Sequence, residues 1–132
     1  MPRLSTTPIA LRILAKMGCV ADITERRVMK RLTKDWLGFG DIIAVPPKGV
    51  GVLVLQVTSM TNVSSRVNKI LANEHVSQVL RAENLVEVWG LNSEGSIKPR
   101  SIVLDSDGNL ECKTRSDFIY YVYGKDSFDE KI

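Results

Sequence analysis

The stretch WLGFGDIIAVPPKGVGVLVLQVTSMTNVSSRVNKI, residues 36–70 of 132, decides how this chain folds. It begins with a small-residue loop that ends at Asp41, and an apolar strand is expected from Ile42 to Val45. Pro46 to Gly49 has the composition of a turn, and a second apolar strand is expected from Val50 to Leu55. A helix pattern follows the second strand. The stretch therefore predicts a β-hairpin followed by a helix.

Polar side chains at the open end of this hairpin are predicted to meet. The turn would close the hairpin with Val45 facing Val50. In that register Gln56 is a diagonal neighbour of Asp41 on the same face, and Thr58 continues that face. A shift of the register by one residue would separate them. A carboxylate and an amide are costly at the end of a buried hairpin unless something binds them, so the sequence indicates an ion site.

Length and composition indicate one soluble domain. The chain has a mass of 14.7 kDa, with 25% charged and 44% hydrophobic residues, which suits a single globular core. No apolar run reaches the roughly 18 residues of a membrane span, and a signal peptide is not expected. Cys19 and Cys112 are too few and too far apart for a disulfide framework. We therefore expect a cytoplasmic protein, in the host cytoplasm if the source is viral.

The basic residues are gathered locally, although the net charge is only +3 and the pI is near 9.0. Five of them fall within nine residues: Arg26, Arg27, Lys30, Arg31 and Lys34. A local basic segment of this kind suits a phosphate backbone, and the alternative is a solvated loop. We expect a loop or an irregular strand extension here.

The remaining elements follow from apolar periodicity and turn residues. Helices are expected over residues 8–17, from a cap at Asn62 or Ser64 to residue 71, and over residues 74–82. Strands are expected over residues 19–28, 85–91, 101–104, 109–114 and 118–123. This order predicts an α/β fold with a mixed sheet. One domain would comprise a core at about 8–91, a small β-rich C-terminal extension at about 92–123 and a flexible tail at 124–132.

The order of elements, with an acid before one strand and a polar pair ending the next, resembles the PD-(D/E)XK nuclease superfamily. That superfamily includes restriction endonucleases, Holliday junction resolvases and virus-type replication-repair nucleases. The matching segments are GFGDIIAV, residues 38–45, GVLVLQVTS, residues 51–59, and SSRVNKI, residues 64–70. The resemblance covers roughly residues 8–91 and implies a restriction-endonuclease-like αβββαβ core with a mixed central sheet.

In that family the first Asp and the acid of the (D/E)XK triplet hold a magnesium ion, and the triplet lysine steadies the attacking water. Asp41 matches the first Asp, whereas the triplet is matched by Gln56, Val57 and Thr58. An amide thus replaces the acid and a hydroxyl replaces the lysine. Gln56 and the main-chain carbonyl of Val57 still offer neutral oxygens to a hard cation. The second negative charge of the triplet is missing.

Other residues would replace the acid and the lysine that the triplet lacks. Glu25 would add a carboxylate, and Lys69 or Arg66 would replace the lysine from the following helix. The resemblance thus implies a Mg²⁺ or Mn²⁺ site with the ligands Asp41, Gln56, Glu25 and Val57. The implied catalytic residues are Asp41, Gln56, Lys69, Glu25 and Thr58. The five basic residues of 26–34, together with Arg66, would bind the DNA backbone.

Simpler interpretations stay open at this point. Asp41 could only cap its loop, Gln56 could be a satisfied strand-end amide, and Thr58 could be an ordinary β-former. Asp35 could assist the site or cap the loop, and His75, the one histidine, is expected at the surface.

The favoured function is a metal-dependent endonuclease that cuts DNA, with branched DNA as one candidate substrate. The alternatives are an inactive nuclease-fold module that binds nucleic acid or serves in assembly, and a small structural or interaction protein. Resolvase-like members of the superfamily work as dimers, so a homodimer that buries Tyr121 or Val122 is a further expectation.

Overall fold

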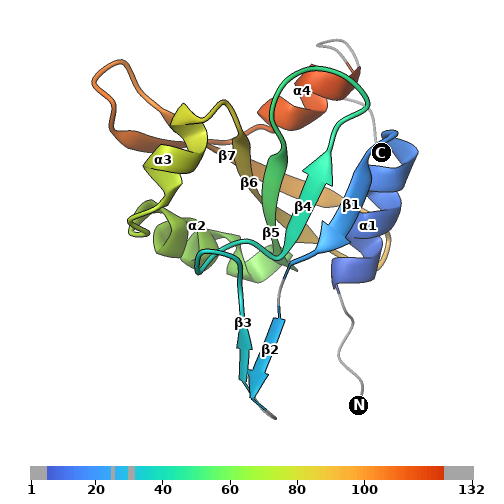
Figure 1. The fold of residues 1–132 in the computed structure, drawn as a ribbon. Helices are drawn as coiled ribbons and strands as arrows, with labels where there is room; N and C mark the ends of the chain where they lie inside the picture. Colours follow the sequence, from blue (N-terminus) through green and yellow to red (C-terminus); the bar gives the residue numbers. More distant parts are fainter. Residues whose placement is uncertain (1–5, 25, 30–31, 124–132) are drawn as a thin grey trace.

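A computed structural model describes residues 6–24, 26–29 and 32–123 of the chain. Within these ranges, a six-stranded sheet lies between helices on its two faces (Figure 1). Its strands, in spatial order, are β1 (Val20–Ile23), β4 (Ile42–Val45), β5 (Leu53–Ser59), β6 (Leu85–Leu91), β7 (Ile97–Leu104) and β8 (Leu110–Lys113). β5 and β6 run parallel, and every other neighbouring pair is antiparallel. The protein is therefore α/β with a mixed sheet, as the sequence predicts.

The helices divide between the two faces of the sheet. α1 (Thr6–Lys16) and α4 (Asp117–Tyr123) pack on one face. The 3-10 helix η1 (Met60–Asn62), α2 (Val63–Leu71) and α3 (Val76–Arg81) belong to the other. None of the helices in the described ranges is long and apolar enough to cross a bilayer, since the longest, α1, has 11 residues.

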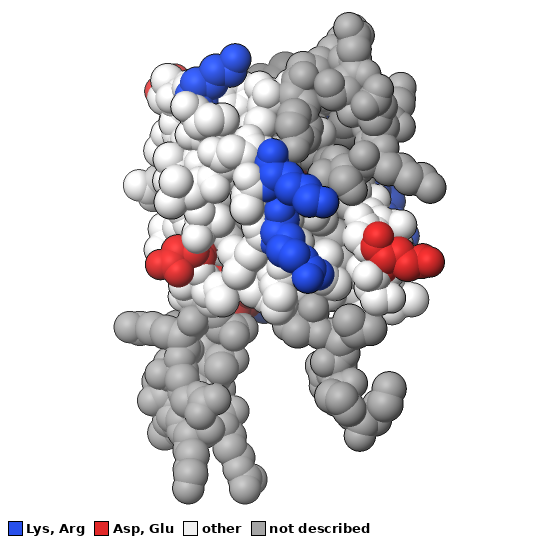
Figure 2. Space-filling view, turned by 90° about the vertical axis from the view of Figure 1, so that its right-hand side faces the viewer, with Lys and Arg blue, Asp and Glu red and all other residues white. Residues whose placement is uncertain are grey.

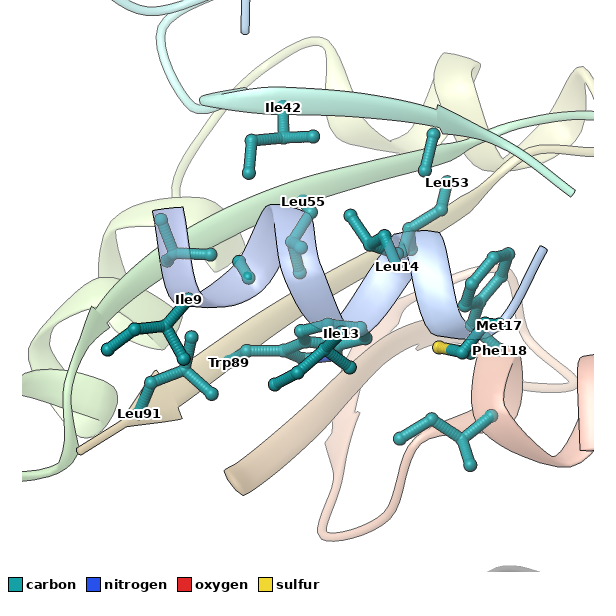
Figure 3. Packing of buried hydrophobic residues seen from close by; sticks show 14 residues of the cluster. Ile9, Ile13, Leu14, Met17, Ile42, Leu53, Leu55, Trp89, Leu91 and Phe118 are labelled. Carbon is teal, nitrogen blue, oxygen red and sulfur yellow. The ribbon is translucent and has the colours of Figure 1, made fainter. Parts of the chain in front are cut away.

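The core beneath α1 is built from alternate residues of the central strands. Leu55 from β5, with Trp89 and Leu91 from β6, belongs to the core cluster on this face. α1 lays Ile9 and Ile13, one helical turn apart, across these strands (Figure 3). Trp89 is fully buried in this cluster.

The opposite face carries the remaining side chains of the same strands. Val54 and Val88 pack there against Val67 of α2. A Cβ on Gly90 would lie 2.4 Å from the Val63 side chain, so glycine at this position lets α2 approach β6 closely. This close packing fixes α2 over the part of β5 that carries Gln56.

The predicted strand over residues 19–28 is in fact two strands. β1 ends at Ile23, and β2 (Arg26–Met29) pairs with β3 (Leu32–Lys34) in a separate two-stranded sheet. Figure 1 shows this β2–β3 hairpin projecting away from the six-stranded sheet. The main chain of Thr24 donates to the Asp41 carbonyl and its hydroxyl donates to the Gly40 carbonyl. These bonds hold the chain where it leaves the main sheet.

The predicted register of the β4–β5 hairpin is wrong by two residues. Ala44 pairs with Leu53, so the connection runs over residues 46–52 and β5 extends to Ser59. Contacts remote in sequence determine this longer loop. The Asn84 side chain accepts from the Val52 N–H, and the Tyr121 hydroxyl donates to the Lys48 carbonyl. A sequence pattern that reports only local turn preference does not contain these contacts.

Residues 118–123 were predicted as a strand and form α4 instead. The Ser116 hydroxyl accepts from the Ile119 N–H, which caps the helix. Phe118 and Ile119 are buried beneath α1, with Val122 packed against the same cluster.

The other predicted elements lie close to their expected positions. The helix predicted over residues 74–82 is shorter and spans Val76–Arg81, while the strand predicted over residues 85–91 is confirmed. The paired strands after residue 96 join the main sheet as β7 and β8.

Candidate functional site

Gln56 is a buried polar residue in the middle of β5, which is buried from Leu53 to Thr58. Its side chain is 1% exposed. Because Leu55 and Val57 belong to the core beneath α1, alternation along β5 directs Gln56 toward α2 and α3. Leu55 is the last residue of β5 that pairs with β4, so Gln56 lies where the β4 side of β5 opens.

Asp35 and Lys69 meet Gln56 at this opening. The Gln56 Nε2 donates to Asp35 Oδ2 at 3.3 Å. The Lys69 Nζ lies 3.8 Å from the same oxygen, with its side chain half exposed to solvent. Asp35 itself is only 15% exposed, so a nearly buried carboxylate links the strand amide to the cation on α2.

No donor from the described residues reaches the oxygen of the Gln56 amide, Oε1. A carboxylate oxygen only accepts, so the amide nitrogen must face Asp35 and the amide oxygen must face elsewhere. Among the described residues, Gln56 Oε1 is the one buried side-chain polar atom that has no hydrogen-bond partner. A buried acceptor left in this state costs about 1–3 kcal/mol. The cost is recovered if the oxygen binds a ligand.

Asp41 reaches the same part of β5 from the neighbouring segment. Its N–H donates to the Leu55 carbonyl at 2.9 Å, and its Oδ2 accepts from the Val57 N–H at 3.0 Å. The carboxylate is therefore held against the residue that follows Gln56. Asp35, Asp41, Gln56 and Lys69 form what we call the Gln56 site.

The other predicted residues have different outcomes. Thr58 is buried and lies on the same side of β5 as Gln56, and Arg66 lies half-buried on α2, one turn before Lys69. Val57 meets Asp41 through its main chain, although the role of its carbonyl as a ligand stays a prediction.

Of the predicted DNA-binding residues, Arg26 and Arg27 lie on β2 and Lys34 lies on β3. Glu25, Lys30 and Arg31 are outside the described residues.

Asp35 has a larger part in the site than its place in the sequence indicates. Its position directly before Trp36 suggested either a loop cap or a minor role in the site. In the structure it is the shared partner of Gln56 and Lys69. In the sequence, Asp35 is only a single acid before a tight loop of small residues, and this pattern is too common to indicate a functional site.

A cleft of about 720 Å³ adjoins the Gln56 site. One wall is the turn at residues 35–38, the other is the segment at residues 72–75, and Thr24 contributes to the lining. Asp35 belongs both to this wall and to the Gln56 site. His75, which was predicted to be a surface residue, lines the cleft and is about half exposed.

The donor set fits a hard divalent cation that keeps part of its hydration shell. In the described part of the chain, no three His, Cys, Asp or Glu side chains gather as a metal cluster. Mg²⁺, however, is commonly held by one or two carboxylates together with water and substrate phosphate. The carboxylate of Asp41 and the unpartnered Gln56 Oε1 supply that smaller set.

A second buried carboxylate, Glu87, has a structural role. It accepts from Trp89 Nε1 and the Ser116 hydroxyl on one oxygen, and from the Ser101 hydroxyl and the Phe118 N–H on the other. Burial raises the pKa of the Glu87 carboxyl, and these hydrogen bonds oppose the increase. The residue ties α4 to β6 and β7 and lies on the face away from Gln56.

Among the described residues, the face over α1 offers little basic surface (Figure 2). Figure 2 shows a short band of Lys and Arg side chains there, with Asp and Glu side chains to either side. α1 carries Arg12 and Lys16, both exposed. Two cations of this kind, close to acids, do not make an extended surface for a polyanion.

Comparisons with protein-family models, with curated proteins and with solved structures find no match. The side chains at the open side of β5, their burial and their charges are therefore the basis for inferring a function. They combine an unpartnered buried acceptor, two carboxylates and a cation.

Proposed function

We propose that this protein is a divalent-metal-dependent endonuclease that hydrolyses DNA phosphodiester bonds. The observation that carries the proposal is Gln56 Oε1, a buried acceptor with no donor among the described residues. It belongs to an amide that donates to Asp35, and the next residue, Val57, donates its N–H to the Asp41 carboxylate. Such an amide oxygen suits a cation ligand. The order α1, β1, β4, β5, α2, β6 also supports the proposal, because it is the αβββαβ order that the resemblance implies once the β2–β3 hairpin is treated as an insertion.

Gln56 and Asp41 would hold Mg²⁺ or Mn²⁺, with Glu25 and the Val57 carbonyl as the further ligands that the resemblance implies. When bound, the ion would polarise the phosphate and lower the pKa of water. Asp35 would act as a positioning residue, because it fixes the Gln56 amide so that Oε1 is free to coordinate.

The cations of α2 would act on the phosphate and on the attacking water. In hydrolysis the water oxygen forms a bond to phosphorus, the bond from phosphorus to the leaving oxygen breaks, and that oxygen takes up a proton. Lys69, which Asp35 holds at 3.8 Å, would orient the water or screen the developing negative charge. Arg66, one turn earlier on α2, would donate hydrogen bonds to a phosphate oxygen.

Cleavage assays with Asp41→Asn test this function. Wild-type protein in Mg²⁺ or Mn²⁺ should cut single-stranded, duplex or branched DNA, and the variant should lose at least about 100-fold in kcat/KM, since a charged ligand is replaced by a neutral one. Asp22→Asn is the matched control, because Asp22 is exposed on β1 and its substitution should leave cleavage unchanged. Wild-type protein that cuts none of these substrates would rule out the enzyme.

The second candidate is a nuclease-fold module that binds nucleic acid without cutting it. One observation favours it: Gln56 supplies no negative charge at the position where the resemblance implies an acid. DNA binding that weakens steeply with salt, in the absence of any cleavage, would select this alternative.

A further inference from the structure

The cleft beside the Gln56 site has the size of a ligand pocket. Its volume of about 720 Å³ lies within the range of roughly 300–1,000 Å³ that small-molecule and cofactor sites occupy. It shares Asp35 with the Gln56 site, so a molecule bound in the cleft would touch the residue that holds Gln56 and Lys69. The cleft and the proposed reaction centre are therefore parts of one binding region.

The walls of the cleft are fixed before any ligand binds. The Asn73 Nδ2 donates to the Leu37 carbonyl at 2.9 Å, which joins the two walls, and Asn73 Oδ1 accepts from the His75 N–H. Leu37 and Gly38 both have positive φ, at 49° and 86°. A leucine in the left-handed region persists only where the surroundings enforce it. The turn at 35–38 is thus a constrained wall of a preformed cleft.

The lining of the cleft suits a flat heterocycle better than a phosphate. Trp36, Leu37 and Ala72 supply aromatic and apolar surface. Asp35 and Glu74 supply carboxylates, which repel phosphate and accept hydrogen bonds from amino groups. The cations that would attract phosphate, Arg66 and Lys69, project from α2 and do not line the cleft.

We propose that the cleft binds an unpaired nucleobase of the DNA strand whose backbone is cut at the Gln56 site, with the base stacked on Trp36. The proposal rests on the nuclease function given above and names its substrate class: single-stranded or locally unpaired DNA. A base in a duplex must be unpaired and unstacked before it can enter a pocket, whereas a base in a single strand is free to do so. Aromatic stacking of single-stranded bases tolerates many sequences.

Tryptophan emission measures this binding without any cleavage. The full-length protein in EDTA would be titrated with a ten-nucleotide single strand, and with a blunt duplex that contains the same sequence. The single strand should quench the emission and bind at least about tenfold more tightly than the duplex. Trp36 should be the reporter, because the other tryptophan, Trp89, is fully buried.

Two substitutions assign the effect to Trp36. Trp36→Leu should abolish the quenching and weaken single-strand binding by about tenfold, with duplex binding unchanged. Trp36→Phe keeps an aromatic ring and should restore most of the affinity without the quenching, which also guards against a folding defect of the leucine variant. Equal affinity for single strand and duplex, or quenching that survives in Trp36→Phe, would overturn the proposal.

Cleavage rates separate this inference from the nuclease function. If single-stranded and duplex DNA are cut with equal kcat/KM and Trp36→Leu cuts as well as wild type, the base site is wrong while the nuclease stands. If no DNA is cut but the Trp36-dependent binding remains, the nuclease function is wrong and the base site stands.

Discussion

Gln56 places an amide at a position where a fully buried strand normally carries an apolar side chain. Half of that amide is satisfied by Asp35, and the other half has no partner among the described residues. A buried unpaired acceptor is rare in folded proteins and calls for a reason. Coordination of a cation is the reason that the neighbouring carboxylates favour.

Gln56→Glu should make the protein depend on metal for its stability. The variant puts a carboxylate oxygen where the amide nitrogen now lies, 3.3 Å from Asp35 Oδ2, so without metal the like charges should lower the Tm. A bound cation should relieve this repulsion. The Tm increase on adding Mg²⁺ or Mn²⁺, measured by calorimetry, should exceed that of wild type.

The matched control is Gln78→Glu, since Gln78 is exposed on α3 and faces no site. Its Tm should respond to metal as wild type does. A metal response of Gln56→Glu that equals or falls below that of wild type would contradict the assignment of Gln56 as a ligand. At saturating metal, about 100 times Kd, the expected stabilisation is roughly 2.7 kcal/mol.

Glu87 gives a second prediction at the scale of a single residue. Burial raises its pKa, so its contribution to stability is fully present below the ordinary pKa of glutamate and is lost as pH rises through the raised value. In Glu87→Gln the group does not titrate, and the amide resembles the protonated acid. The stability advantage of wild type over the variant should therefore shrink as pH rises from about 4.

Urea midpoints across this pH range measure that difference. Glu94→Gln, at an exposed turn position, is the control and should show no such trend. An advantage of wild type that grows with pH would mean that the four hydrogen bonds to Glu87 outweigh its burial. The direction of its pKa shift would then be the reverse.

At the scale of elements, we propose that the β2–β3 hairpin holds the DNA backbone. It projects from the sheet and carries Arg26, Arg27 and Lys34 (Figure 1). Its strands adjoin the loop that contains Asp35 and Asp41, so DNA along the hairpin would be guided toward the Gln56 site. Backbone contacts of this kind raise affinity without reading sequence.

Removal of two hairpin cations should reduce the salt dependence of DNA binding. For Arg26→Ala/Arg27→Ala, the slope of log Kd against log salt should fall in magnitude by about 1 with a single-stranded oligonucleotide. The control is Arg12→Ala/Lys16→Ala, which removes the same charge from the exposed side of α1. Equal slopes for the two double variants would mean that net charge alone, and not the position of the hairpin cations, determines the salt dependence of DNA binding.

For the whole molecule, the sequence predicted the layers better than the connections. β6 matches its predicted bounds, and α1 and α2 lie close to theirs, because a long apolar run or a helical stripe depends on local residues. The register of β4 and β5 was missed because Asn84 and Tyr121 fix the loop from remote parts of the chain. α4 was missed because the hydrogen bond from its Phe118 N–H to the buried Glu87, 31 positions away in the sequence, is a tertiary contact.

The candidate site was predictable to a similar extent. The two-residue error in register conserves the face of each side chain, so the predicted grouping of Asp41 with Gln56 survives it. The role of Asp35 was not predictable, since its contacts with Gln56 and Lys69 join residues 21 and 34 positions away. Only the folded chain brings these three together.

The most direct test is a crystal of the protein soaked in Mn²⁺ and measured at the manganese absorption edge. The proposed function predicts an anomalous peak bonded to Gln56 Oε1 and to the Asp41 carboxylate, and predicts that Asp41→Asn removes it. A crystal that takes up manganese elsewhere, or that leaves Gln56 Oε1 hydrogen-bonded within the protein, would contradict the metal site and the nuclease function with it.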